Sequence, residues 1–209
     1  MTYKQIEDVV KAKDWEFLIK HYLPLNVVEH HSFKESMLIV GHLVIQAMDV
    51  RTEEITEFLS DFAINVMIIL RAEHPKEWFA DWKNDAFLGA KCMSVFRHAE
   101  AFLYVKNAFL SLEDPPTSLI YAYIAAGRHC PSPYLSDEEE EELSLKAIKK
   151  EITYEWALKM AKIAYFKGDK TMDQYWEKQA EELERKNIHT AAIVPNAIKE
   201  LSNIKNMEK

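Results

Sequence analysis

The chain has 209 residues, of which only 4 are glycine, and a net charge of −8. This length fits one domain whose core is large enough to need no disulfide or metal. Tight hairpins and phosphate-binding loops require glycine, so its scarcity argues against all-β folds and dinucleotide-binding α/β folds. The negative charge disfavours nucleic acid and anionic membranes as partners, and it favours a basic protein partner.

The two cysteines, Cys92 and Cys130, are too few for a disulfide framework and do not have zinc-site spacing. They are predicted to be free, buried thiols in a reducing compartment, with a reactive Cys130 as the alternative. The first residues lack the apolar core of a signal peptide. The apolar stretches 37–50 and 62–70 are shorter than a membrane span. We therefore expect a cytoplasmic protein that does not enter a membrane.

Apolar residues recur at helical spacing along nearly the whole chain, and the alternation typical of strands is almost absent. This pattern predicts an all-α fold of about eight stacked antiparallel helices. Ser32 with Glu35, and Ser136 with Glu139, have the spacing of capping boxes at helix starts. The expected helices cover residues 3–22 (with a break near Lys13), 32–49, 53–72, a short piece at 75–83, 85–112, 118–128, 136–167 (with a kink near Thr153), 171–187 and 190–206.

Charge is unevenly distributed along the chain. Residues 137–209 contain 29 charged residues in 73 positions, against 31 in the 136 positions of residues 1–136. We therefore predict a single domain over 1–209, with an apolar helical core in 1–136 and a charged helical layer in 137–209. The expected helix 136–167 has two apolar stripes on opposite sides, which is typical of an inner helix in a solenoid.

One segment resembles a known family. Residues 164–169 read Ala-Tyr-Phe-Lys-Gly-Asp, and two aromatic residues and an alanine follow at Tyr175, Trp176 and Ala180. Over residues 155–187 this resembles one degenerate tetratricopeptide helical hairpin, although the turn is one residue short and no proline closes the unit. The resemblance implies a solenoid-type scaffold at the C-terminal end that binds a peptide or protein, and it implies no catalytic residues.

Aromatic residues supply the candidate binding positions. Trp78 and Trp82 follow Pro75 closely, and a second group lies in the hairpin-like segment. Such side chains either line a groove for a partner or fix a loop to the core. The candidates are Trp78, Trp82, Tyr165, Tyr175 and Trp176.

A different constellation indicates metal chemistry. His31, Glu35 and His42 share a narrow polar stripe on the helix expected at 32–49. Two ligands at i and i+4 can meet one divalent ion, and His98 could join from a neighbouring helix. The alternative is that the stripe is a solvated helix face on which Glu35 acts as a cap. No HExxH or comparable motif completes a known metal site.

The sequence thus favours a non-catalytic scaffold, adaptor or inhibitor of the immunity type, without a cofactor, that binds a protein or peptide and is compatible with a homodimer. The alternative function is a small helical-bundle metalloprotein or hydrolase that uses a divalent metal ion.

Overall fold

The computed structural model describes residues 3–50, 52–131 and 135–199. These residues form an all-α protein with no strand among them, as the helical periodicity predicts. The helices are shorter and more numerous than expected. Twelve have both ends within the described residues, and a further turn of helix begins at 196: α1 (Tyr3–Lys11), α2 (Trp15–His21), α3 (Pro24–His30), α4 (Phe33–Asp49), α5 (Glu53–Glu73), α6 (Pro75–Phe79), α7 (Lys83–Ser94), α8 (His98–Leu110), α9 (Thr117–His129), α10 (Asp137–Ile148), α11 (Tyr154–Phe166) and α12 (Lys170–Arg185).

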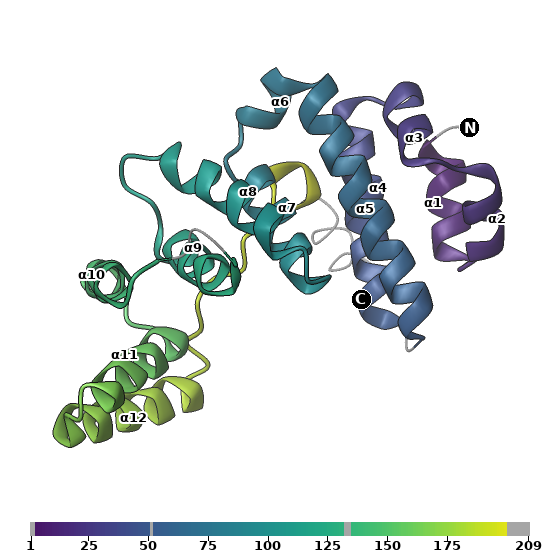
Figure 1. Ribbon diagram of the computed structural model, residues 1–209. Helices are drawn as coiled ribbons and strands as arrows, with labels where there is room; N and C mark the ends of the chain where they lie inside the picture. Colours follow the sequence, from purple (N-terminus) through teal and green to yellow (C-terminus); the bar gives the residue numbers. More distant parts are fainter. Residues whose placement is uncertain (1–2, 51, 132–134, 200–209) are drawn as a thin grey trace.

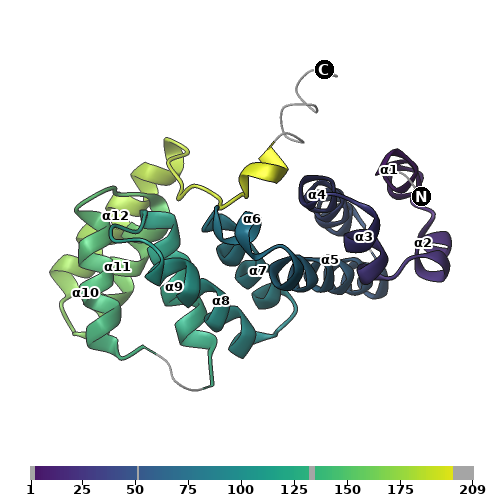
Figure 2. The same cartoon turned by 90° about the horizontal axis from the view of Figure 1, so that it is seen from above.

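The helices follow one another along a curved array (Figure 1). Helices that are neighbours in sequence pack as neighbours in space, most extensively in the pairs α4–α5, α7–α8 and α11–α12. The segment after α12 runs back along the inner side of the curve toward α7, so the end of the described chain lies beside its N-terminal half (Figure 2).

The largest apolar core lies in the N-terminal half, where α4 and α5 are apolar on nearly all sides and pack against α1, α3 and α7. Burying a side chain of leucine or isoleucine size contributes about 1.5–3 kcal/mol, so this cluster supplies most of the hydrophobic stabilisation. Smaller clusters join α8 to α9 and α11 to α12. The fully buried large residues of the main core include Met37, Leu43, Leu59, Ile64 and Leu70.

Both predicted capping boxes are confirmed. The Ser32 hydroxyl accepts a hydrogen bond from the Glu35 backbone N–H at 3.3 Å, and the Glu35 carboxylate accepts from the Ser32 N–H at 3.0 Å. Ser136 and Glu139 make the same reciprocal pair at the start of α10. These bonds satisfy N–H groups that have no partner inside the helix, which is why the helices begin there.

The helix predicted over 85–112 is divided at Phe96, and this part of the prediction is wrong. Phe96 has a left-handed backbone with φ of 61°, and the Arg97 N–H donates to the Cys92 carbonyl at 2.9 Å. This bond closes α7 with the turn that glycine usually makes at a helix end. Lys13 and Asn187 have a similar positive φ after α1 and α12. Among the described helix ends with a left-handed residue, only the end of α11 has glycine there, at Gly168.

Three further boundaries differ from the prediction. The helix expected over 136–167 is two helices, since α10 ends at Ile148 and α11 begins at Tyr154. Between them, the hydroxyl of the buried Thr153 forms a hydrogen bond with the hydroxyl of Thr190 at 2.7 Å. No helix was predicted between residues 22 and 32, but α3 forms there, with Pro24 in its first turn, where the N–H that proline lacks would have no partner inside the helix. Residues 190–195 of the helix expected over 190–206 are not helical; 200–206 lie outside the described residues.

Cys92 and Cys130 are both buried and form no disulfide, as predicted. Burial raises the pKa of the Cys92 thiol to about 11. None of the described helices combines the length and apolarity needed to cross a bilayer.

Candidate interaction site

A pocket of about 610 Å³ opens where the end of α9, the first turn of α10 and the end of α11 meet. Sequence reasoning did not predict this site, because its walls come from three separate helices. Charged side chains surround an apolar wall formed by Ile163 and Phe166. The lining includes Arg128, Asp137, Glu140, Ile163, Phe166 and Lys167.

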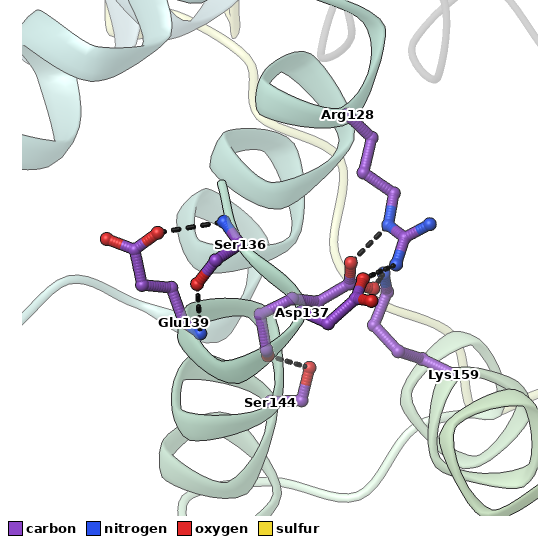
Figure 3. A network of polar contacts seen from close by, with 7 residues as sticks. Arg128, Ser136, Asp137, Glu139, Ser144 and Lys159 are labelled. Atoms are coloured by element: carbon purple, nitrogen blue, oxygen red, sulfur yellow. Dashed lines mark hydrogen bonds and ion pairs between the residues drawn. The ribbon is translucent and has the colours of Figure 1, made fainter. Parts of the chain in front are cut away.

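Glu140, which lines this pocket, is only 4% exposed and lies at the centre of an ion network. The Arg128 Nε donates to Glu140 Oε2, and the Lys159 Nζ donates to Oε1 at 2.5 Å. Arg128 also reaches Asp137 at 3.4 Å (Figure 3). The Ser144 hydroxyl donates to the Glu140 carbonyl at 2.7 Å. Three consecutive helices, α9, α10 and α11, are thereby joined by one carboxylate.

Electrostatics hold Glu140 and Lys159 as an ion pair. Burial by itself would raise the pKa of Glu140, but hydrogen bonds from Lys159 and Arg128 outweigh it and keep that pKa below its usual range. Burial lowers the pKa of Lys159, and the Glu140 carboxylate opposes that shift. The network therefore fixes the walls of the pocket. Its remaining rim is acidic, because Asp137 and Glu138 are exposed on the first turn of α10.

Exposed aromatic side chains lie directly beside this pocket at the end of α11. Phe166 is 72% exposed and contacts Tyr165, which is also mostly exposed, with ring centroids 5.7 Å apart. Tyr175 on α12 is half exposed. Of the predicted binding residues, Tyr165 and Tyr175 are thus accessible to a partner. Phe166 was not among the candidates, although it is adjacent to Tyr165 in the sequence.

The tryptophans predicted for binding are less accessible. Trp78 is 1% exposed; its indole N–H donates to Asp85 at 2.8 Å and its ring packs edge-on against Phe33. Trp176 is buried in the α11–α12 hairpin against Ala157 and Ala161. Trp78 and Trp176 are therefore mostly inaccessible to a partner in this structure.

Trp82 is half-buried against the α8–α9 cluster, and the ammonium of Lys83 lies 5.8 Å from its ring centroid. It is therefore a partly accessible residue fixed to the core.

The four candidate metal ligands do not come together. Glu35 is engaged by Ser32 in its capping box, and His42 lies 3.4 Å from Glu7. His31 is buried, its Nε2 has no hydrogen-bond partner, and burial lowers its pKa. His98 stacks on His129 at 5.3 Å between ring centroids. Across the described parts of the chain, no group of three or more His, Cys, Asp or Glu residues is placed to hold a metal ion.

A second exposed apolar surface follows α8. Leu103 and Leu110 lie seven residues apart on one face of α8 and are both exposed, and Phe96, in the turn before α8, is 83% exposed. Exposed apolar groups at helical spacing are typical of a face that a partner helix covers. Its exposed residues provide control positions for substitutions in the pocket between α9, α10 and α11.

Comparison of the chain with protein-family models, with curated proteins and with solved structures finds no match.

Proposed function

We propose that this chain is a non-catalytic, cytoplasmic interaction protein, a scaffold, adaptor or inhibitor, that binds a basic protein partner on its C-terminal helices. The observation that carries the proposal is the exposed pair Tyr165 and Phe166 beside the acidic-rimmed pocket between α9, α10 and α11. The α11–α12 hairpin, with alanines at its helix contact and Gly168 in its turn, supports a tetratricopeptide-like, solenoid-type scaffold as part of the same proposal.

The apolar part of the pocket has the features of a binding hot spot. Aromatic residues dominate such spots when they lie next to a concavity that a partner side chain can fill. Covering the exposed ring of Phe166 contributes about 1.5–3 kcal/mol by area alone. The Glu140 network holds α9, α10 and α11 in fixed positions, which reduces the ordering cost of binding.

Charge determines the kind of partner. Lys167 is paired with Glu141, and Arg128 is paired with Glu140, so the cations at the pocket already have partners. Asp137 contacts Arg128 at 3.4 Å but remains almost fully exposed at the rim, and Glu138 is exposed beside it. An arginine or lysine of the partner can therefore pair with the rim carboxylates while its aliphatic stem packs on Phe166.

Affinity capture from lysate of the source cells, followed by titration calorimetry with the purified partner, tests the proposal. We expect Phe166→Ala to weaken binding at least tenfold and Asp137→Asn to reduce the salt dependence of binding. Leu110→Ala, a similarly exposed apolar residue on α8, is the matched control and should bind as the unsubstituted chain does.

Circular dichroism must show the helix content of each variant unchanged. If Phe166→Ala binds with unaltered affinity, or if Leu110→Ala loses binding instead, the pocket is not the interaction site.

A further inference from the structure

The C-terminal strap, residues 188–199, occupies the inner side of the curved array. It leaves α12, passes α9 and α8, and ends beside α7 (Figures 1 and 2). Its segment 190–195 is not helical, although helical spacing predicted a helix there. The strap thus joins the C-terminal hairpin to the N-terminal core across a surface that the helices alone would leave open.

The first anchor of the strap is Glu155 on α11. Its carboxylate accepts a hydrogen bond from the Thr190 backbone N–H at 2.7 Å and contacts His189 Nδ1 at 2.9 Å. The hydroxyls of Thr190 and the buried Thr153 are 2.7 Å apart. A carboxylate on α11 therefore accepts a hydrogen bond from the backbone of the non-helical strap.

The second anchor repeats this chemistry at the other end. Asp81, between α6 and α7, accepts from the Asn196 backbone N–H at 2.8 Å, and Lys83 donates to the Asn196 side-chain oxygen at 3.1 Å. Pro195 is buried beside this contact, and Ile198 is 6% exposed within the N-terminal core cluster. A backbone hydrogen bond and the burial of two apolar side chains are thus combined within residues 195–198.

The stretch between the anchors is held by side-chain packing. Ile193 packs against the α8–α9 cluster and Val194 against the N-terminal core. Ala191 and Ala192 are exposed. Because Ile193 and Val194 are only partly buried and the two alanines are exposed, this stretch is less firmly held than the two anchors and can exchange with a competing segment.

We propose that the surface under the strap is a recognition groove for a peptide and that the strap, non-helical over 190–195 and helical from 196, occupies it as an intramolecular ligand. Backbone hydrogen bonds combined with pockets for apolar side chains are a general means by which proteins bind peptides. The partner segment has the chemistry of residues 193–198, Ile-Val-Pro-Asn-Ala-Ile, with apolar residues flanking Pro-Asn. This inference goes beyond the proposed function, because its groove is separate from the Phe166 pocket.

The strap competes strongly because it is tethered. A ligand on a short linker acts at an effective concentration in the millimolar range, so a free peptide of equal intrinsic affinity cannot displace it at micromolar concentration. Weakening either anchor should open the groove to a peptide in solution.

The test uses a fluorescent peptide of residues 187–199 and the full chain, with fluorescence anisotropy as the readout. We expect the Ile198→Asp variant to bind the peptide at least tenfold more tightly than the unsubstituted chain does. The addition of Asp81→Ala to that variant should remove at least tenfold of the gained affinity. Ile198 contacts the core, so a second variant weakens the strap at its other anchor and leaves Ile198 in place. Thr190→Pro removes the backbone N–H that donates to Glu155.

Circular dichroism and size-exclusion chromatography accompany both variants. If folded Ile198→Asp and Thr190→Pro bind the peptide no better than the unsubstituted chain, the strap is a structural element only and the proposal is overturned. A concentration-dependent dimer that blocks the peptide would assign the groove to the strap of a second copy and would also overturn the proposed partner. Loss of partner binding in Phe166→Ala is measured separately, so failure of one proposal is distinguishable from failure of the other.

Discussion

Replacement of Gly89 by alanine tests how closely α7 and α8 approach each other. A Cβ built on Gly89 would lie 2.5 Å from Val105 Cγ2, 2.9 Å from the Ala101 carbonyl oxygen and 3.2 Å from the Val105 backbone nitrogen. The Val105 side chain can turn away, but the two backbone atoms belong to α8. The added methyl group therefore forces the two helices apart.

The expected cost follows from two opposing effects. Overpacking of a core contact costs about 1–3 kcal/mol, and contacts with backbone place Gly89→Ala at the upper end of that range. Alanine is favoured over glycine inside a helix by roughly 1 kcal/mol, which offsets part of the cost. We therefore expect the free energy of unfolding to fall by about 2 kcal/mol.

Gly127→Ala is the matched control. Its added Cβ would meet side-chain atoms of Leu135 at 3.0 Å and of Phe102 at 3.3 Å, which can move without displacing a helix. The free energy of unfolding of this variant should stay within about 1 kcal/mol of the original value.

Urea denaturation followed by circular dichroism measures both variants. With a denaturant slope of about 2 kcal/mol per M, the midpoint of Gly89→Ala should fall by about 1 M. If Gly89→Ala unfolds at the same or a higher urea concentration than the unsubstituted chain, α7 and α8 do not pack at this distance and the reasoning is refuted.

Three further predictions concern the charged and strained groups. Glu140→Gln leaves the ammonium of Lys159 without its counter-charge, and the free energy of unfolding measured by urea denaturation should fall by about 2–4 kcal/mol. The double variant Glu140→Leu/Lys159→Met removes both charges and should recover most of that loss. Burial would raise the pKa of Glu155, but hydrogen bonds from Thr190 and His189 lower it to about 2. The stabilisation of the fold by the ionised Glu155 is complete above pH 4.5, the pKa of this group in the unfolded chain, and is lost as the pH falls toward 2. The loss amounts to about 2 kcal/mol for this quarter-exposed group. Thermal unfolding of Glu155→Gln, measured against pH, should lack this part of the pH dependence. Phe96→Gly should raise the free energy of unfolding by about 1 kcal/mol, because glycine accepts the left-handed backbone without strain; an unchanged or lower melting temperature would contradict this.

The local features of the fold could be predicted from the sequence. A capping box needs only Ser and Glu three positions apart, and both Ser32–Glu35 and Ser136–Glu139 form as expected. The left-handed helix end at Phe96 could not be found in this way, because no glycine, proline or asparagine marks it. Packing of α8 on α7 holds that residue in a conformation its own preference disfavours.

The candidate site shows the same division. Residues 137–142 are six consecutive acids, and periodicity alone cannot distinguish the buried Glu140 from its exposed neighbours Glu138 and Glu139. The distinction comes from Arg128 on α9 and Lys159 on α11, which meet that one carboxylate. Sequence patterns similarly marked the aromatic residues without deciding which are buried.

The sequence by itself determined that the protein is all-α and where most of its helices begin, since helical period and capping act over a few residues. Tertiary structure alone decided that Trp78 is a core residue, that Glu140 joins three helices, and that residues 190–195 cross the array as an extended strap. Each of these depends on contacts between residues far apart in the chain. The strap shows this most clearly, because its partners Asp81 and Glu155 lie on opposite halves of the array.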